Sequence, residues 1–256
     1  MTELLIAGAG PAGSAAALLA ARRGIATTII ERSVFPRAKV CGEYLSPSTV
    51  EALHALGVGP SLASCAAEID GVLLIAKHAR AQIRFTRAGW SLPRSTLDER
   101  LLQAALDAGA ALVHARVEDC TEDAGAVHLR ARLSNGDERL YSARILIAAD
   151  GMQSTVARKL RLTRKEPRAA RFAAGGHFAN VGCQQRFIEM YVDGSSYLAI
   201  NPFRSGTANV MLIVNRRELR EHGGVDAAFE RRTQALAPQR FAQASLLGQR
   251  IAIGPL

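Results

Sequence analysis

The sequence has 256 residues, of which 48% are hydrophobic and 21% charged, a composition typical of a soluble globular protein with a buried core. The net charge of +9 comes from scattered basic residues without an aromatic-interleaved patch, so nucleic acid is excluded as the expected partner. The apolar run Ala15 to Ala21 is too short to span a bilayer, and Glu3 stands where a signal peptide would be basic, so we expect a cytoplasmic protein.

The first element is a strand followed by a glycine-rich turn and a helix. The apolar run Leu4 to Ala7 predicts a buried parallel strand. Gly8, Gly10 and Gly13 follow as G-x-G-x-x-G, and Ser14 to Arg23 has a helical composition. This arrangement permits a tight turn, close approach of the backbone to a pyrophosphate, and close packing of the helix, whose N-terminus attracts phosphate. It predicts a dinucleotide site.

The next strand, Thr27 to Ile30, ends at Glu31, about 20 residues after the last glycine, where an acidic side chain reaches the ribose hydroxyls of a dinucleotide. A surface carboxylate at a strand end is the alternative. A carboxylate here would repel a 2′-phosphate, so NADP is disfavoured at this site.

The middle of the chain continues the alternation of strands and helices. A capping box with Glu99 at its third position predicts a helix that begins at Ser95 or Thr96. Leu112 to Val117 predicts a third strand of the same sheet, and Asn135-Gly136 between alternating segments predicts a hairpin.

A second motif lies far along the sequence, in "ARILIAADGMQSTVARKL". The apolar strand Arg144 to Ala149 is followed by Asp150-Gly151 and by a helical stretch from Thr155 to Leu160. It resembles the Asp-Gly motif of flavoprotein hydroxylases and, paired with the opening motif, indicates FAD rather than NAD. A simple Asp-Gly turn is the alternative.

These two motifs, with "FPRAKVCGEYLSP" at Phe35 to Pro47, carry a family resemblance. The sequence to about Asn215 resembles the FAD-dependent oxidoreductases of the geranylgeranyl reductase and FixC-like group, relatives of p-hydroxybenzoate hydroxylase and of flavin halogenases. The resemblance implies an α/β (overall α+β) fold, with a glutathione-reductase-type Rossmann FAD domain and an antiparallel-sheet substrate domain. The FAD domain is expected over residues 1–70 and 90–165, and the substrate domain over residues 71–89 and 166–250.

The resemblance also implies a set of cofactor contacts. Arg94 corresponds to an arginine that contacts the flavin, Val117 meets the adenine, and the loop with Cys41 and Gly42 runs along the flavin. A buried, small apolar role is the alternative for Cys41. No catalytic residue is assigned, but Cys41 and Tyr197 are candidates. The expected cofactor-binding residues are Gly8, Gly10, Ala12, Gly13, Glu31, Arg32, Cys41, Gly42, Arg94, Val117, Asp150 and Gly151.

The segment "YLAINPFRSGTANVMLIV", Tyr197 to Val214, resembles the Y-x-W-x-F-P element of prenyl reductases. It departs from that element at Ala199, in place of Trp, and at Asn201, in place of Phe, which predicts a remodelled pocket. Four cysteines, Cys41, Cys65, Cys120 and Cys183, show no metal-ligand spacing, so we expect free thiols and no metal site.

The sequence stops at Leu256, before the third cofactor element that the resemblance implies, a Gly-Asp loop and helix beside the flavin ribityl chain. A truncated chain, half of a split enzyme and a degenerate remnant all stay open. We therefore expect weak FAD retention, and a complementing C-terminal segment or subunit as a partner.

The leading functional prediction is an FAD-dependent oxidoreductase that reduces a double bond of a small apolar molecule, of lipid, isoprenoid or polyketide type. NAD(P)H is expected only as a transient electron donor, and peripheral membrane association stays open. The alternatives are a flavin monooxygenase that hydroxylates an aromatic or polyketide substrate, and a non-catalytic or split flavoprotein subunit.

Overall fold

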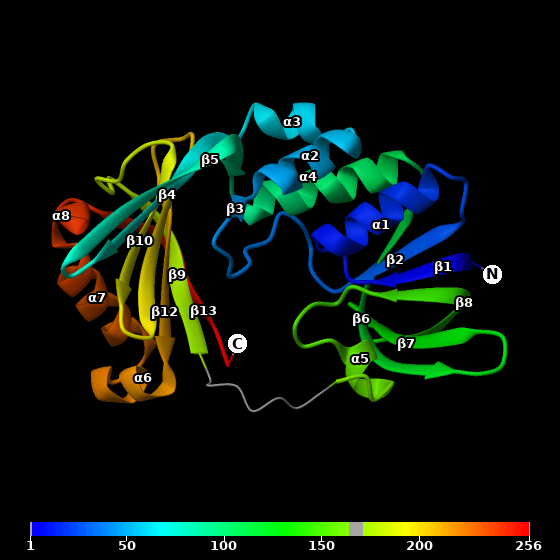
Figure 1. Ribbon diagram of the computed structural model, residues 1–256. Helices are drawn as coiled ribbons and strands as arrows, with labels where there is room; N and C mark the ends of the chain where they lie inside the picture. The colour runs from blue at the N-terminus through cyan, green and yellow to red at the C-terminus, as the bar shows by residue number, and fades with distance from the viewer. Residues whose placement is uncertain (1, 164–170, 256) are drawn as a thin grey trace. The chain divides into compact units, whose positions relative to one another are not determined.

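The computed structural model describes residues 2–163 and 171–255, which fall into two units (Figure 1). Unit 1 comprises Met1–Arg37, Leu56–Val58 and Ser95–Glu166. Unit 2 comprises Ala38–Ala55, Gly59–Arg94 and Pro167–Leu256. The predicted FAD and substrate domains stay predictions. Residues 38–55, 59–70 and 90–94 of the predicted FAD domain lie in unit 2, and the predicted boundary at 165/166 lies outside the described residues.

Unit 1 is built on five strands, whose order β1-β2-β6-β7-β8 closes on itself (Figure 1). β1 pairs in parallel with both β2 and β8, so that Leu5 lies opposite Thr28 on one side and Leu146 on the other. The predicted hairpin at Asn135-Gly136 joins β7 to β8, and Gly136 has the positive φ, 92°, that such a turn requires. The strands are β1 (Thr2–Ala7), β2 (Thr27–Glu31), β6 (Ala111–Glu122), β7 (Val127–Leu133) and β8 (Glu138–Ala148).

The predicted helices of unit 1 are present. They are α1 (Pro11–Ala21), α4 (Arg94–Asp107) and α5 (Thr155–Lys159). Helix α1 buries Ala17 and Leu18 completely. The strands bury Leu5, Ile30 and Leu129 in one cluster. Because these strands are covered by apolar side chains, the loops at their carboxyl ends are held in a defined geometry.

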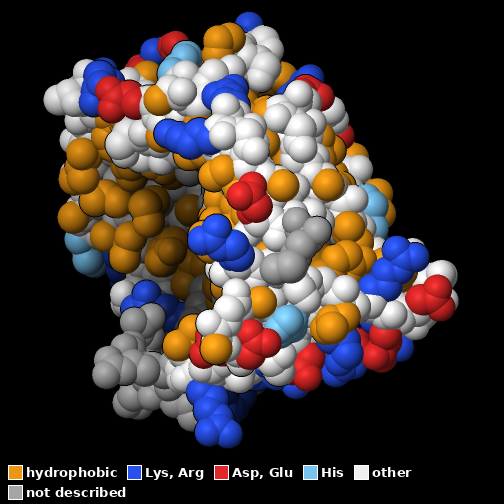
Figure 2. Space-filling view, turned by 90° about the vertical axis from the view of Figure 1, so that its right-hand side faces the viewer, with side chains coloured by type: hydrophobic (Ala, Val, Ile, Leu, Met, Phe, Trp, Pro, Cys, Tyr) orange, Lys and Arg blue, Asp and Glu red, His pale blue; other side chains and the backbone are white. Residues whose placement is uncertain are grey.

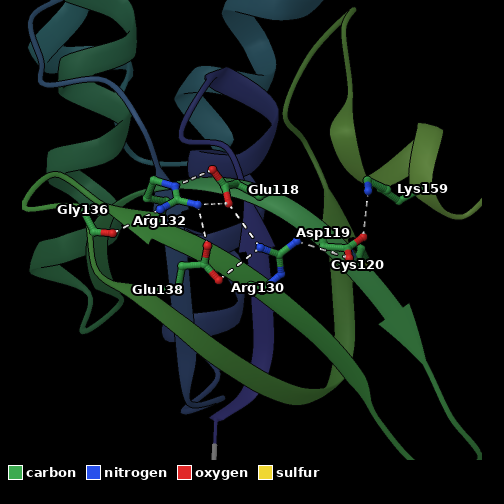
Figure 3. Close-up of polar contacts among 8 residues, drawn as sticks. All are labelled: Glu118, Asp119, Cys120, Arg130, Arg132, Gly136, Glu138 and Lys159. Carbon is green, nitrogen blue, oxygen red and sulfur yellow. Dashed lines mark hydrogen bonds and ion pairs between the residues drawn. The ribbon is translucent and has the colours of Figure 1, made fainter.

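The hairpin of unit 1 carries a network of ion pairs on its exposed surface (Figure 3). Arg132 donates from Nε to Glu118 at 2.7 Å, and Arg130 bridges Glu118 and Glu138. Lys159 of α5 pairs with Asp119 at 3.1 Å. Hydrogen bonding by Arg132 lowers the pKa of the Glu118 carboxyl, and hydrogen bonding by Lys159 lowers that of Asp119.

This network predicts acid sensitivity of unit 1. Because both carboxyl pKa values are lower in the fold than in the unfolded chain, their stabilisation is complete above the unfolded values and is lost as pH falls through the folded ones. The urea midpoint should therefore fall below about pH 4.5, and it should fall less steeply in Glu118→Gln. Glu99→Gln, an exposed change on α4, should keep the wild-type pH slope. Equal slopes in Glu118→Gln and wild type would contradict the prediction.

Unit 2 is built on one sheet with the strand order β13-β9-β12-β11-β10-β4-β5-β3. The sheet is antiparallel as predicted, with one exception: β10 pairs with β4 in parallel. The strands are β3 (Tyr44–Leu45), β4 (Ala67–Ala76), β5 (Ala79–Ser91), β9 (Arg171–Ala179), β10 (Phe187–Asp193), β11 (Ser196–Pro202), β12 (Ala208–Asn215) and β13 (Ser245–Ile253). The helices are α2 (Pro47–Ala55), α3 (Gly59–Ala63), α6 (Arg216–His222), α7 (Val225–Leu236) and α8 (Pro238–Phe241).

The two faces of this sheet differ in their side chains. In β12, Val210 and Leu212 join the core cluster that includes Phe229 of α7, on the side where α6, α7 and α8 lie in Figure 1. Because side chains alternate along a strand, Asn209 and Met211 point to the opposite face. One face therefore builds the core of unit 2, and the other is left for different contacts.

Basic side chains on the face of the molecule shown in Figure 2 lie among acidic and neutral ones, without a continuous basic stripe. Within residues 2–163 and 171–255, no helix is both long and apolar enough to cross a membrane.

Candidate functional site

The glycine-rich turn of unit 1 has the geometry that the sequence predicts. Gly8 has a φ of 96°, and its N–H donates to the Ile30 carbonyl at 2.8 Å. A Cβ on Gly13 would lie 1.9 Å from the Gly8 carbonyl oxygen, so α1 can approach β1 only because residue 13 is glycine. Gly10 precedes α1, which has no side-chain cap at its N-terminus. The start of α1 therefore offers backbone N–H groups to an anion.

The structure brings the two predicted motifs together. Ala149 donates its N–H to the Ala7 carbonyl at 2.8 Å, and a Cβ on Gly8 would lie 2.4 Å from the Ala149 carbonyl oxygen. Asp150 Oδ2 accepts from the Thr155 N–H at 2.6 Å and so caps α5. Asp150 Oδ1 is buried without a hydrogen-bond partner among the described residues. It is an unsatisfied acceptor beside the turn, suited to a hydroxyl donor.

Glu31 is buried, with 7% of its surface exposed, and it ties the end of β2 to the turn. Its Oε2 accepts from the Ala9 N–H and its Oε1 from the Ser33 N–H, both at 2.8 Å. The carboxylate thus stabilises the turn directly. Since a carboxylate offers about four lone-pair sites, both oxygens keep acceptor capacity, and the ribose contact of Glu31 stays a prediction.

Arg37 lies beside the turn, and the sequence analysis missed it. Its Nη2 is 3.8 Å from the position of a Cβ on Gly10 and 3.3 Å from the fully buried carboxylate of Asp98. Its Nε is buried without a hydrogen-bond partner among the described residues, and the guanidinium lies 4.9 Å from the Phe35 ring centroid. The run Phe35-Pro36-Arg37 in the sequence was the available signal.

The residues of unit 1 fit the adenosine diphosphate half of FAD. The open side of Gly10 meets a guanidinium, α1 starts without a side-chain cap, and Asp150 has an unsatisfied buried oxygen. Pyrophosphate and hydroxyl groups would satisfy these groups. Of the other predicted contacts, Ala12 and Arg32 are exposed and Val117 is partly buried in β6, and the roles of these residues and of Gly151 stay predictions.

The loop that contains Cys41 and Gly42 belongs to unit 2, where two side chains of the sheet hold its backbone. Asn209 donates to the Cys41 carbonyl at 2.8 Å. Asn201 donates to the carbonyls of Gly42, at 3.0 Å, and Glu43, at 2.9 Å. Cys41 Sγ accepts from the Glu43 N–H at 3.3 Å. Cys41 is therefore partly buried in a fixed loop, and its contact with the flavin stays a prediction.

Glu43 is the second anchor of this loop, and the sequence analysis did not single it out. It has a φ of 56°, which is uncommon for a residue other than glycine. Its Oε1 accepts from the Arg94 N–H at 2.7 Å, and its Oε2 lies 2.6 Å from Nε2 of His177. The backbone of Arg94 thus meets the loop, whereas the flavin contact of its side chain stays a prediction. No local pattern marked His177, because its partner lies 134 residues away.

Tyr197, the second catalytic candidate, lies on β11 and packs with Ala173, Met211 and Ile213, a cluster to which Val40 also contributes. It is partly buried. Its catalytic role stays a prediction.

Comparison with known proteins shows relatives that are named as reductases. The chain is 31% identical over 225 residues to digeranylgeranylglycerophospholipid reductase 2 of Methanopyrus kandleri, covering 84% of this chain and 55% of that protein. It is 30% identical over 197 residues to menaquinone reductase of Mycolicibacterium smegmatis, covering 75% and 47%. The chain therefore spans about half the length of these curated relatives.

Solved structures share the fold. A flavoprotein/dehydrogenase of Cytophaga hutchinsonii superposes with a TM-score of 0.89 at 23% identity, over 98% of this chain and 66% of that one. A flavin-dependent brominase superposes with a TM-score of 0.89 at 21% identity, over 99% and 67%. The sequence model of the FAD binding domain matches residues 1–253. The chain belongs to the FAD binding domain family.

Proposed function

We propose that the chain is the FAD-binding and substrate-facing part of an oxidoreductase that reduces a carbon–carbon double bond of an isoprenoid or similarly apolar molecule. FAD, when bound, supplies the hydride-transfer chemistry. The residues of unit 1 around Gly10, Arg37 and Asp150 would hold its pyrophosphate and adenosine. The names of the relatives, menaquinone reductase and digeranylgeranylglycerophospholipid reductase, support substrates with long apolar chains.

The observation that carries this proposal is an apolar patch on the face of the unit 2 sheet opposite the core cluster, which we call the apolar floor. Its residues Ala173, Met211 and Ile213 are 4%, 5% and 9% exposed. Its small and apolar residues form two rows across the neighbouring strands β9, β12 and β11. One row is Gly175, Met211 and Ala199, and the other is Ala173, Ile213 and Tyr197. Gly175 admits no side chain, because its Cβ would meet the Val210 carbonyl oxygen at 2.0 Å. The paired residues of the floor carry no charge, which suits an apolar substrate.

The floor ends at the loop of Cys41, Gly42 and Glu43. This loop is anchored on the next residue along the same face of each strand, namely His177 of β9, Asn209 of β12 and Asn201 of β11. Ala199, which stands where the resembling reductases have a Trp, is part of the floor. A small side chain here widens the floor beside Met211, so we expect a bulkier or differently shaped apolar substrate than a single linear prenyl chain.

The test uses the chain supplied with FAD, reduced anaerobically by dithionite and mixed with a detergent-solubilised polyprenyl quinone or a geranylgeranyl lipid. We expect the flavin to be reoxidised without oxygen, and the product to stay two hydrogens heavier after any quinol has been reoxidised to quinone in air. A second arm with NADH or NADPH in place of dithionite tests the transient donor. Reduced flavin that neither substrate reoxidises would overturn the proposal.

The second candidate function is a monooxygenase, favoured by the shared fold of the flavin-dependent brominase. It predicts a product that gains one oxygen and turnover that requires O₂, so anaerobic turnover in the same assay excludes it. A non-catalytic subunit predicts FAD binding without reoxidation by substrate. Peripheral membrane association and a complementing C-terminal segment stay proposals, to be tested by vesicle flotation and by adding that segment to the assay.

A further inference from the structure

Three polar side chains cross the otherwise apolar face of the sheet in one line, which we call the polar row. His177 of β9 lies directly opposite Asn209 of β12, and Asn209 lies directly opposite Asn201 of β11. Asn201 and Asn209 are 2% and 3% exposed. The row adjoins the pair Gly175–Met211 of the apolar floor, so polar groups meet the floor along this edge.

The two asparagines already account for the position of the loop above the row. They donate three hydrogen bonds of 2.8–3.0 Å to consecutive backbone carbonyls, those of Cys41, Gly42 and Glu43. Neutral donors therefore fix the loop without an ionisable partner. The contact between Glu43 and His177 is different in kind, because it joins a carboxylate to an imidazole.

Glu43 and His177 pair a buried carboxylate with a partly exposed imidazole. The carboxylate is 5% exposed, one oxygen is fixed by the Arg94 N–H, and the other lies 2.6 Å from His177 Nε2. Since a carboxylate oxygen accepts, Nε2 carries the proton, which leaves Nδ1 as the second site of the ring. The Phe203 ring, 5.0 Å away and nearly perpendicular, restricts the plane of the imidazole.

The imidazole is partly exposed. The His177 side chain is 37% exposed, and no hydrogen bond of Nδ1 is seen among the described residues. Its neighbours across the sheet, Asn209 and Leu247, are uncharged. Glu43 is the ionisable side chain that bonds the ring. Burying the Glu43 carboxylate costs several kcal/mol. The two asparagines already position the loop, so its position does not require this carboxylate.

We propose that His177 is the proton donor of the reduction and that Glu43 is its positioning residue, an inference that rests on the proposed function. One alkene carbon gains a hydride, with its two electrons, from the reduced flavin. The neighbouring carbon gains the proton that leaves His177 Nδ1, the π bond is lost, and solvent returns a proton to Nδ1. The Glu43 carboxylate stabilises the imidazolium before transfer, as in other carboxylate–histidine pairs.

The decisive variant is His177→Gln, since the glutamine amide can still donate to Glu43 but cannot transfer a proton. With dithionite-reduced FAD, we expect the rate of alkene reduction to fall about 10²–10⁴-fold, and added imidazole to restore part of it. Oxidation of the same reduced flavin by ferricyanide, which needs no protonated carbon, should be unchanged. His54→Gln, at the histidine that packs on Trp90 in the same unit, should leave both rates as in wild type.

A second readout needs neither FAD nor substrate. In the ¹⁵N ring spectrum of the chain, neutral His177 should be the Nε2–H tautomer, and Glu43→Leu should remove this preference. A neutral ring with the proton on Nδ1 would overturn the inference.

Failure of the His177 inference and failure of the proposed function would give different results. An active wild-type chain with an equally active His177→Gln would overturn the role of His177 and leave the proposed function intact. A wild-type chain that binds FAD but reduces no apolar alkene would overturn the proposed function, and the inference with it.

Discussion

Gly13→Ala should abolish FAD retention and lower the free energy of unfolding by about 3 kcal/mol or more, at the upper end of the usual cost of overpacking. The added Cβ would lie 1.9 Å from the Gly8 carbonyl oxygen and 3.2 Å from Ile6 Cγ2. The nearest obstacle is backbone, so α1 must move away from β1, and its N-terminus moves with it. Urea unfolding gives the stability, and quenching of flavin fluorescence gives the affinity.

Two other glycines of unit 1 separate folding from binding in this experiment. Gly125→Ala, in a loop of unit 1 with no atom within 4 Å of the new Cβ, should stay within about 0.5 kcal/mol of wild type. Gly10→Ala has only Arg37 Nη2 nearby, at 3.8 Å, so it should fold normally but weaken FAD binding. Wild-type stability of Gly13→Ala would show that α1 does not need this close approach.

Glu189→Ala should destabilise unit 2 by about 3–5 kcal/mol, the usual cost of removing one partner of a buried ion pair. Glu189 is fully buried on β10, and both its oxygens are engaged. Oε1 accepts from the Gln184 N–H and from Arg240 Nη2, each at 2.9 Å, and Oε2 accepts from Arg240 Nε at 2.9 Å and from the Tyr191 hydroxyl at 2.7 Å. Burial, with the bond to Glu189, raises the pKa of Tyr191 to about 12.

The cost arises because the variant leaves the Arg240 guanidinium and the Tyr191 hydroxyl without their acceptor. The double change Glu189→Leu with Arg240→Met removes both charges and should recover most of the loss. Asp70→Asn breaks an exposed pair with Arg186 in the same unit and should cost at most about 1 kcal/mol. Urea midpoints of the wild type, Glu189→Ala, the double variant and Asp70→Asn measure these differences in stability. A Glu189→Ala midpoint equal to that of Asp70→Asn would contradict the prediction.

The elements that the sequence predicted well are those specified by local patterns. The strand, glycine turn and helix at the start and the hairpin at Asn135-Gly136 depend on residues close in sequence. Periodicity and turn chemistry are sufficient for these elements, because each places its own apolar side chains on one side.

The elements that the sequence did not predict depend on distant pairings. The parallel pairing of β10 with β4 joins residue 187 to residue 71, and nothing in either strand marks its partner. The loop around Cys41 was assigned to the FAD domain on its place in the chain, yet it packs on strands 134 to 168 residues away.

The sequence by itself determined the family resemblance, the dinucleotide turn and the presence of a conspicuous cysteine loop, since glycines and apolar runs act through local sterics. Only the tertiary structure decided which residues hold that loop. His177, Asn201 and Asn209 lie on three different strands, and they form one row because the register of β9, β12 and β11 places them opposite one another. Strand register is set by the packing of the whole sheet, so a side chain's partner across the sheet is a property of the fold rather than of its neighbours in sequence.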